Sequence, residues 1–194
     1  MIIGITGGTG CGKTTLLKLI EEKGGLILDC DAIYHDLLNK DPSLLAAIEA
    51  RFPGTVCDGI LDRKKLGSMV FSDENALLEL NRITHGAVRQ QVLLALERKP
   101  KLAAIDAIGL FEGELAPLCD VTVAVTASRK NRIARLMDRD GISEEYAAKR
   151  IDAQKDDTWF AQMCDHVLEN NGTEDAFREK CLDFLSTLGI LTKM

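Results

Sequence analysis

Near its N-terminus the chain carries the pattern G-x-x-x-x-G-K-[ST], which residues 7–14 match as Gly-Gly-Thr-Gly-Cys-Gly-Lys-Thr. An apolar run precedes the pattern and a helix-like stretch follows it. In such a loop, glycines let successive backbone N–H groups turn toward an anion, and the helix dipole adds to the attraction. Lys13 supplies a charge for the β- and γ-phosphates, and the Thr14 hydroxyl is a ligand for Mg²⁺. The pattern therefore predicts a strand, a phosphate-binding loop and a helix, in that order.

The composition is typical of one compact globular domain. Of 194 residues, 46% are hydrophobic and 28% are charged, so the chain is long enough to bury most of the surface that it exposes when unfolded. No apolar run approaches the roughly 18 residues of a membrane span, and no secretory pattern precedes the first strand. We therefore expect a cytoplasmic protein with no membrane partner, as a monomer or a weak homo-oligomer.

The net charge and the cysteines limit the partners further. A net charge of −6 argues against nucleic acid, because binding to a phosphate backbone needs a basic footprint. A small phosphorylated ligand in a local basic pocket is compatible with that charge. The six cysteines are scattered without a C-x-x-C pair, and Cys11 lies inside the loop. We expect reduced thiols rather than disulfides or a zinc site.

Short β-branched runs alternate with longer helix-like stretches, which is the pattern of a mostly parallel sheet flanked by helices. The predicted class is α/β, with five short apolar strands buried on both faces: residues 1–6, 26–30, 102–107, 121–126 and 166–169. Helices are expected at residues 31–39, 42–52, 62–71, 75–98 and 174–188. In the last of these, a stripe at helical spacing predicts core packing: Phe177, Cys181, Phe184, Leu185 and Leu188.

The gap between the second and third strands is too long for one crossover connection, so it predicts an inserted helical subdomain. We expect a single domain, residues 1–194, with three parts. The core covers about 1–30, 100–127 and 158–194, the helical insertion about 31–99, and a charged segment about 128–157.

Three acidic residues follow predicted strands, at the sheet edge where ligands bind in folds of this kind. Asp29 and Asp31 end the second strand and would point to the same side if the extended geometry continues. One of them could accept a hydroxyl proton or hold a Mg²⁺-bound water; alternatively, they are helix N-caps, a position that Asp favours. Asp106 ends the third strand, where phosphate-loop enzymes carry a magnesium-binding acid, and we expect a metal or substrate role for it.

The charged segment carries four arginines at spacings of three, three and four, which place them along one helix face: Arg129, Arg132, Arg135 and Arg139. Such a helix can act as a lid that brings positive charge to phosphate oxygens and excludes water. The alternative is a solvated face paired with neighbouring acids. The phosphate loop favours the lid.

Several segments, in order along residues 1 to about 172, resemble the dephospho-CoA kinase family. The family opens with G-x-T-G-G-x-G-x-G-K-[ST], here residues 4–14, and continues with a D-A-D-like element, here Asp29-Cys30-Asp31. Where the family usually has two prolines, this chain has Gly86 and Ile108, changes that concern the backbone of the acceptor pocket. Further matches are residues 59–63 with Leu66 and Val70-Phe71, Ile83-Thr84-His85, Leu110-Phe111-Glu112, Arg139-Asp140, Gln154 and residues 165–172.

The resemblance implies a P-loop small-molecule kinase. It would transfer the γ-phosphoryl group of ATP, with Mg²⁺, to the ribose 3′-hydroxyl of dephospho-CoA, in the last step of coenzyme A synthesis. The general base would be Asp31, and Arg139, helped by Arg135, would neutralise charge from the lid. The helical insertion would hold the acceptor.

The resemblance also implies which residues meet each ligand. Thr6, Asp31, His85, Arg135 and Arg139 would meet the acceptor or the transferred group, and Thr14 and Asp106 would hold the metal. By itself, His85 is more typical of a packed or surface histidine. Nucleotide binding would involve Gly8, Thr9, Gly10, Cys11, Gly12, Lys13, Thr14 and Thr15, with Asn170 and Gly172 beside the adenine.

Two other functions compete with this one. A different small-molecule kinase, for a nucleoside or a sugar, would share the loop and the lid but not the Asp29/Asp31 pair, the segment at residues 61–63 and residues 170–172 together. A switch-type NTP-binding module would turn over NTP slowly with no small acceptor, and the sequence has no N-K-x-D guanine-reading element.

Overall fold

The computed structural model describes residues 1–71 and 73–190, so Ser72 of the predicted insertion and residues 191–194 of the predicted core lie outside it. The chain divides into two compact units. The sheet unit comprises residues 1–27, 100–110 and the part from Ala116 onward, and the helical unit comprises residues 28–99 and 111–115.

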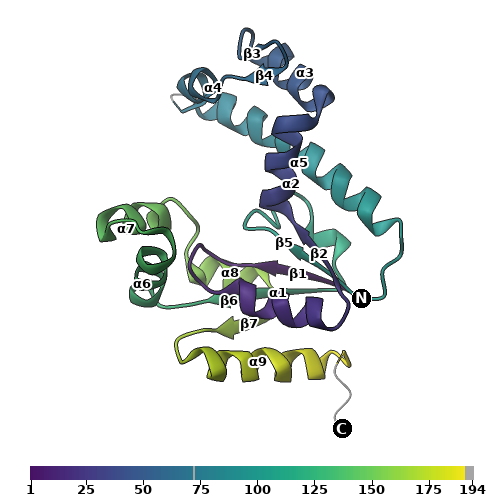
Figure 1. The fold of residues 1–194 in the computed structure, drawn as a ribbon, viewed down its shortest axis with the longest axis vertical. Helices are drawn as coiled ribbons and strands as arrows, with labels where there is room; N and C mark the ends of the chain where they lie inside the picture. Colours follow the sequence, from purple (N-terminus) through teal and green to yellow (C-terminus); the bar gives the residue numbers. More distant parts are fainter. Residues whose placement is uncertain (72, 191–194) are drawn as a thin grey trace. The chain divides into compact units, whose positions relative to one another are not determined.

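The sheet confirms the predicted fold class. Five strands lie in the order β2-β5-β1-β6-β7 (Figure 1), and the pairings of β1 with β5 and β6, and of β6 with β7, are parallel. The central strands are buried on both faces, as the apolar runs predicted. The bounds are β1 Ile2–Thr6, β2 Leu26–Asp29, β5 Ala103–Asp106, β6 Val121–Thr126 and β7 His166–Glu169.

Two helices pack together beside this sheet and complete its main core: α1 (Lys13–Glu22) and α9 (Glu174–Thr187). Leu16, Leu19 and Ile20 of α1 belong to the same buried cluster as Ile3 and Ile5 of β1. The predicted stripe on α9 is confirmed as core packing. Its residues Phe177, Cys181, Phe184 and Leu185 are buried in that cluster, and Leu188 packs against it.

A second, smaller core joins two helices of the charged segment, α6 (Arg129–Asp140) and α7 (Glu144–Asp152). Leu136 packs with Ala147 and Ile151 there. A short helix that the sequence reading missed, α8 (Asp157–Met163), follows, and a 3-10 turn at Ala116–Leu118 precedes β6. The charged segment therefore contains a packed helical hairpin.

The helical unit is organised around its longest helix, α5 (Glu74–Leu96), which packs against α2, α3 and α4. The predicted helices are present with ends shifted by a few residues: α2 Cys30–Lys40, α3 Pro42–Arg51 and α4 Arg63–Val70. A two-stranded hairpin of β3 (Val56–Cys57) and β4 (Ile60–Leu61) is present that the sequence pattern did not predict. Its turn residues Asp58 and Gly59 both have positive φ, as a tight hairpin requires.

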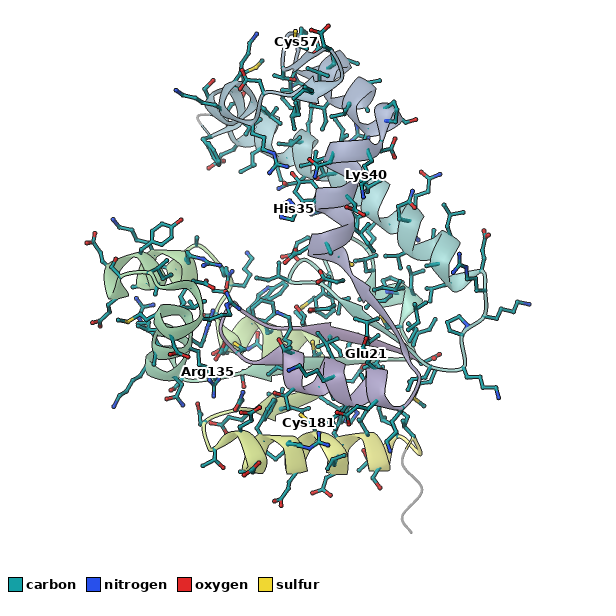
Figure 2. All side chains as sticks on the ribbon, in the orientation of Figure 1. Glu21, His35, Lys40, Cys57, Arg135 and Cys181 are labelled. Atoms are coloured by element: carbon teal, nitrogen blue, oxygen red, sulfur yellow. The ribbon has the colours of Figure 1, made fainter. Side chains whose placement is uncertain are left out.

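All six cysteines lie within the described residues, and none of them forms a disulfide. In Figure 2, Cys57 lies in the hairpin of the helical unit and Cys181 lies on α9 of the sheet unit. Burial raises the pKa of Cys181 to about 11, because the apolar core disfavours a thiolate. Within the described residues, no helix is long and apolar enough to cross a membrane.

A carboxylate ties the edge strand β7 to β6, and this contact gives a stability prediction. Asp165 accepts hydrogen bonds from the Thr122 hydroxyl (2.7 Å) and the Thr122 backbone N–H (2.8 Å). These bonds lower the pKa of Asp165 below its ordinary 3.8. The ionised carboxylate therefore contributes stability above pH 3.8, and the contribution is lost as the pH falls through the folded-state pKa.

We expect Asp165→Ala to lower the free energy of unfolding by about 0.5–1 kcal/mol at neutral pH, a modest value because the side chain is exposed and screened. In urea unfolding series, parent and variant should converge in strong acid. Asp138→Ala, which removes an exposed carboxylate on α6, is the control. A constant difference at all pH values would show that the Thr122 bonds do not act through the ionised group.

Candidate functional site

The loop between β1 and α1 has the backbone that its glycines predicted. Gly7, Gly10 and Gly12 have φ angles of 133°, 79° and 93°, a region that side chains disfavour. At Gly7 a Cβ atom would lie 2.1 Å from the Val125 carbonyl oxygen, so β6 leaves no room for a side chain. The loop is closed by a hydrogen bond from the Cys11 N–H to the Gly8 carbonyl. The sequence and the backbone therefore agree on a tight anion-binding turn.

The N-terminus of α1 differs from that of every other α-helix in the part of the chain that the structure describes. Its N-cap is Gly12 in the left-handed conformation, and no side chain caps it. First-turn N–H groups that are not capped are available to an anion, and the helix dipole favours negative charge there. The other eight α-helices each begin with a side-chain cap: Asp29, Asp41, Asp62, Asp73, Ser128, Ser143, Asp156 and Thr173.

Lys13 and Asp106 lie together beside this loop. The Lys13 ammonium donates to the Gly7 carbonyl (3.1 Å) and lies 3.8 Å from Oδ1 of Asp106. Both side chains are more than four-fifths buried, so the pair attracts more strongly than a surface pair. Thr14, the next residue of α1, is exposed.

These residues fit a hydrated Mg²⁺. Within residues 1–71 and 73–190 no group of three His, Cys, Asp or Glu side chains could hold a metal alone. Mg²⁺ in kinase sites takes one or two protein oxygens and fills its shell with water and substrate phosphates. The Thr14 hydroxyl and the Asp106 carboxylate supply oxygens of that kind.

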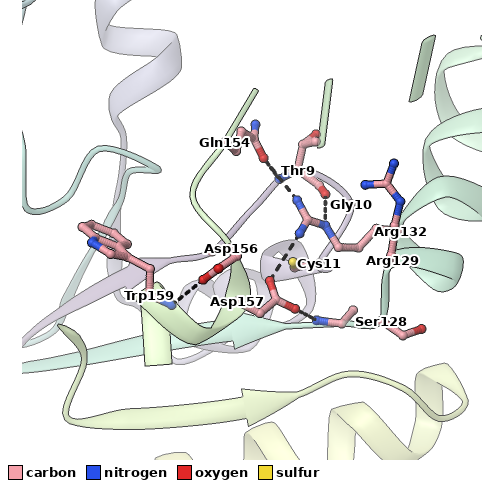
Figure 3. Close-up of polar contacts among 12 residues, drawn as sticks. Thr9, Gly10, Cys11, Ser128, Arg129, Arg132, Gln154, Asp156, Asp157 and Trp159 are labelled. Carbon is pink, nitrogen blue, oxygen red and sulfur yellow. Dashed lines mark hydrogen bonds and ion pairs between the residues drawn. The ribbon is translucent and has the colours of Figure 1, made fainter. Parts of the chain in front are cut away.

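Two of the four arginines of α6 hold the loop from outside. The Arg132 side chain is 5% exposed and donates to the Thr9 carbonyl (2.9 Å), to Gln154 and to Asp157, as Figure 3 shows. Arg135 donates to the Gly10 and Cys11 carbonyls, each at 3.3 Å. Both side chains contact the loop, so the solvated-face alternative does not describe them, and the lid stays a prediction.

The remaining two arginines are exposed and form ion pairs. Arg129 pairs with Asp152 of α7. Arg139 donates to both oxygens of Asp140, which also accepts from Arg150 of α7. These two guanidinium groups lower the pKa of Asp140 to about 2. Arg139 thus lies at the surface in the last turn of α6.

Asn170 joins the loop to the end of β7. Its amide donates to the Cys11 carbonyl (2.8 Å), and its side-chain and backbone oxygens accept from Arg135. A Cβ atom at Gly12 would lie 2.4 Å from the Asn170 Nδ2 atom. The predicted loop residues and Asn170 therefore form one cluster, and the exposed Gly172 lies two residues further along the chain.

Two predicted residues of the sheet unit have partners within it. The Thr6 hydroxyl, fully buried, donates to the Ile108 carbonyl (3.2 Å) and ties the end of β1 to the segment after β5. The Thr15 N–H donates to the Gly12 carbonyl in the first turn of α1.

In the helical unit, the extended geometry does not continue through Asp31, so the condition for Asp29 and Asp31 to point to the same side is not met. Asp29 is the N-cap of α2 and accepts from the Ala32 N–H (2.9 Å), so the helix begins at Cys30 and the strand ends one residue earlier than predicted. Asp31 lies in the first turn of α2 and is exposed. The capping alternative therefore describes Asp29 and leaves the Asp31 carboxylate available.

His85 lines a cavity of about 360 Å³ in the helical unit. The His85 Nδ1 atom lies 3.3 Å from the Glu112 carbonyl oxygen, and Arg89 donates to the Glu114 carbonyl. Gly86, where the family usually has proline, continues α5 without interruption. The wall of this cavity thus combines α5 with the segment 111–115.

The residues that the sequence reading did not single out for the loop are Arg132, Gln154 and Asp157. The Thr9 N–H donates to the Gln154 Oε1 atom (2.8 Å), and Asp157 accepts from Arg132 (3.3 Å). Gln154 was noted only as a family match, and nothing in the spacing distinguished Arg132 from its neighbours. Burial and tertiary contacts, which the spacing does not reveal, distinguish the four arginines.

Comparison with known proteins identifies the family. A model of the family described as dephospho-CoA kinase matches residues 1–175. The chain belongs to the dephospho-CoA kinase family. A dephospho-CoA kinase from Thermobifida fusca is 34% identical over 177 residues, covering 89% of this chain and 88% of that protein. One from Anaeromyxobacter dehalogenans is 37% identical, covering 96% and 92%.

Solved structures agree on the fold. A crystal structure from Thermus thermophilus superposes with a TM-score of 0.80 at 33% identity, covering 100% of this chain and 98% of that one. A shikimate kinase from Bacteroides thetaiotaomicron has a TM-score of 0.59 at 16% identity, covering 98% and 99%. The second likeness shows the fold alone.

The contact of Gly12 with Asn170 gives a prediction for nucleotide binding. Gly12→Ala places a Cβ atom against the Asn170 amide in a left-handed backbone, so the start of α1 must move. We expect the Kd for ADP, measured by calorimetry, to rise about tenfold or more, the effect of losing a hydrogen bond to a charged group. Gly24→Ala is the matched control, because Gly24 also has positive φ (76°) but a Cβ atom there would meet no other atom within 4 Å.

The control should lose about 1–2 kcal/mol of stability from backbone strain and keep parental ADP affinity. Equal losses of affinity in the two variants would assign the effect to strain and not to the loop.

Proposed function

We propose that the chain transfers the γ-phosphoryl group of ATP to the ribose 3′-hydroxyl of dephospho-CoA, giving CoA and ADP in the last step of coenzyme A biosynthesis. The observation that carries the proposal is the uncapped N-terminus of α1 beside Lys13, in a chain that the dephospho-CoA kinase model matches over residues 1–175. In the reaction, the hydroxyl oxygen forms a bond to phosphorus while the bond to the ADP oxygen breaks.

In the sheet unit, the loop residues 8–15 bind the phosphates of ATP. The Lys13 ammonium holds the β- and γ-phosphates, moving from the Gly7 carbonyl, which it contacts at 3.1 Å, to stronger anionic acceptors. Thr14 and Asp106 hold the Mg²⁺ ion, which neutralises charge on the phosphates when it is bound. Asn170 and Gly172 border the adenine.

Arg139 neutralises the charge that spreads over the transferred group, with Arg135 as its helper. The position of Arg139 at the end of α6, exposed and paired with Asp140, supports this role. An exposed ion pair is weak, so Arg139 can exchange Asp140 for a phosphate at low cost. The segment 128–157 then acts as the lid, with the rest of the chain divided into the core and the insertion predicted above.

In the helical unit, the Asp31 carboxylate accepts the proton of the 3′-hydroxyl. Its support is its exposure in the first turn of α2 and its place just after β2, because ligands of open α/β sheets bind beyond the carboxyl ends of the strands. Residues 31–99 hold the nucleotide and pantetheine parts of the acceptor, and His85 contacts the acceptor in this unit. Thr6 is the acceptor-binding residue of the sheet unit. We further propose a cytoplasmic protein, a monomer or a weak homo-oligomer.

The reaction itself is tested by a coupled assay for ADP. We expect ADP production that requires both Mg²⁺ and dephospho-CoA, with a kcat on the order of 1 to 100 per second. Turnover that is indifferent to dephospho-CoA but rises with a nucleoside or a sugar would assign a different acceptor. Slow hydrolysis that no acceptor accelerates would favour a switch-type module.

The general base is tested by Asp31→Asn, which keeps the size of the side chain. We expect kcat to fall about 10²- to 10⁴-fold, the usual range for general acid–base catalysis, with ATP affinity unchanged. Lys13→Met should weaken ATP binding as well, because Lys13 meets the nucleotide before and during the reaction.

Asp36→Asn is the matched control. It removes one carboxylate from the same helix, where Asp36 pairs with Lys40 at 3.0 Å on the surface, and it should leave both constants near parental values. Near-parental turnover in Asp31→Asn would show that Asp31 is not the general base. Asp29 or Asp106 would then be the candidates for that role.

A further inference from the structure

Arg132 makes three polar contacts around the middle of the phosphate loop. Its Nε donates to the Thr9 carbonyl (2.9 Å), Nη2 to Oε1 of Gln154 (3.2 Å), and Nη1 to Oδ1 of Asp157 (3.3 Å). The same Gln154 oxygen accepts from the Thr9 N–H (2.8 Å). Both polar groups of the Thr9 backbone are therefore held, one directly by Arg132 and one through Gln154 (Figure 3).

The burial of Arg132 separates this role from that of a phosphate ligand. Its side chain is 5% exposed, against 60% for Arg139. A buried guanidinium costs much free energy unless its donors are satisfied and its charge is paired. Here Asp157 supplies the opposite charge and accepts from Nη1, while the Thr9 carbonyl accepts from Nε and the Gln154 Oε1 atom from Nη2. The guanidinium thus binds protein groups and not a phosphate.

The loop glycines show how closely Arg132 packs against the loop. A Cβ atom at Gly8 would lie 2.1 Å from the Nη2 atom of Arg132, and one at Gly10 would lie 2.9 Å from its backbone oxygen. The glycines thus serve two purposes, the left-handed backbone at Gly10 and the close approach of an arginine at Gly8.

We propose that Arg132 is a positioning residue for phosphate binding. It fixes the Thr9 carbonyl to α6 and, through Gln154, the Thr9 N–H to the segment between α7 and α8. The rest of the loop then keeps the curvature that an anion needs. It acts through the backbone of Thr9, without touching the phosphates. The proposal rests on the proposed nucleotide site and extends it to a residue outside the loop.

A lysine cannot reproduce this arrangement, because one ammonium has no planar set of donors that reaches three acceptors in fixed directions. Arg132→Lys keeps the charge beside Asp157, and Arg132→Met keeps most of the length without the charge. The two variants therefore separate the geometry of the contact from its charge.

The test measures ADP and AMP binding by calorimetry, without any acceptor. We expect the Kd for ADP to rise about tenfold or more in Arg132→Met and by a smaller factor in Arg132→Lys, since hydrogen bonds to charged groups are of that strength. The Kd for AMP, which lacks the β-phosphate that Lys13 and the loop hold, should change much less. A merely structural role would lower the active fraction and change both ligands alike.

Arg129→Met is the matched control, because Arg129 lies three residues earlier on α6, is exposed, and pairs with Asp152 of α7. It should bind both ligands as the parent does. Parental ADP affinity in a folded Arg132→Met variant, or equal losses for ADP and AMP, would overturn the proposal. A parent that binds no ADP would instead overturn the proposed function.

If thermal unfolding shows that Arg132→Met does not fold, Gln154→Leu tests the proposal in its place. That change removes the acceptor of the Thr9 N–H and keeps the buried ion pair of Arg132 with Asp157. A rise in the Kd for ADP, again larger than the change for AMP, supports the proposal. Parental affinity contradicts it.

Discussion

The attraction between an anion and the open end of α1 is the interaction on which the site depends. A helix leaves its first N–H groups without partners, and proteins usually satisfy them with a side-chain cap. Here the cap position holds Gly12, and the helix begins with Lys13. The free end of α1 is stable only in a tight loop that other parts of the chain hold in shape, and the surrounding contacts supply that support.

Besides Gln154, which holds the Thr9 N–H, the supports come from three places along the chain. Arg132 and Arg135 reach the loop from α6, Asn170 from the end of β7, and the Val125 carbonyl from β6. All follow or end strands of the parallel sheet, so the topology gathers them at the carboxyl ends. A loop with four glycines has high conformational entropy when free, and this set of contacts restricts it before any ligand arrives. The loop is pre-organised, which lowers the entropic cost of binding phosphate.

The strands and the loop could be predicted because their residues carry local signals. Apolar β-branched runs gave the five strands within one residue at each end, and the glycines gave the loop. The hairpin at residues 56–61 had a signal that was missed, the Asp58-Gly59 pair, which favours a tight turn. The helix start at Cys30 was missed by one residue because an aspartate at 29 could end a strand or cap a helix equally well.

The roles of the four arginines could not be predicted, because their spacing is uniform and only tertiary contacts distinguish them. Arg132 and Arg139 are seven residues apart, about 10 Å along α6. Arg132 is buried against the loop, whereas Arg139 lies at the surface. The buried contacts fix the near half of the helix to the loop, so the position of Arg139 depends on how the loop is held. The pair of Arg139 with Asp140 lies at the surface, where water and salt screen the attraction, so Arg139 can leave it for a stronger anion at low cost. One helix thus combines a rigid support for the loop with a charge that is free to exchange partners.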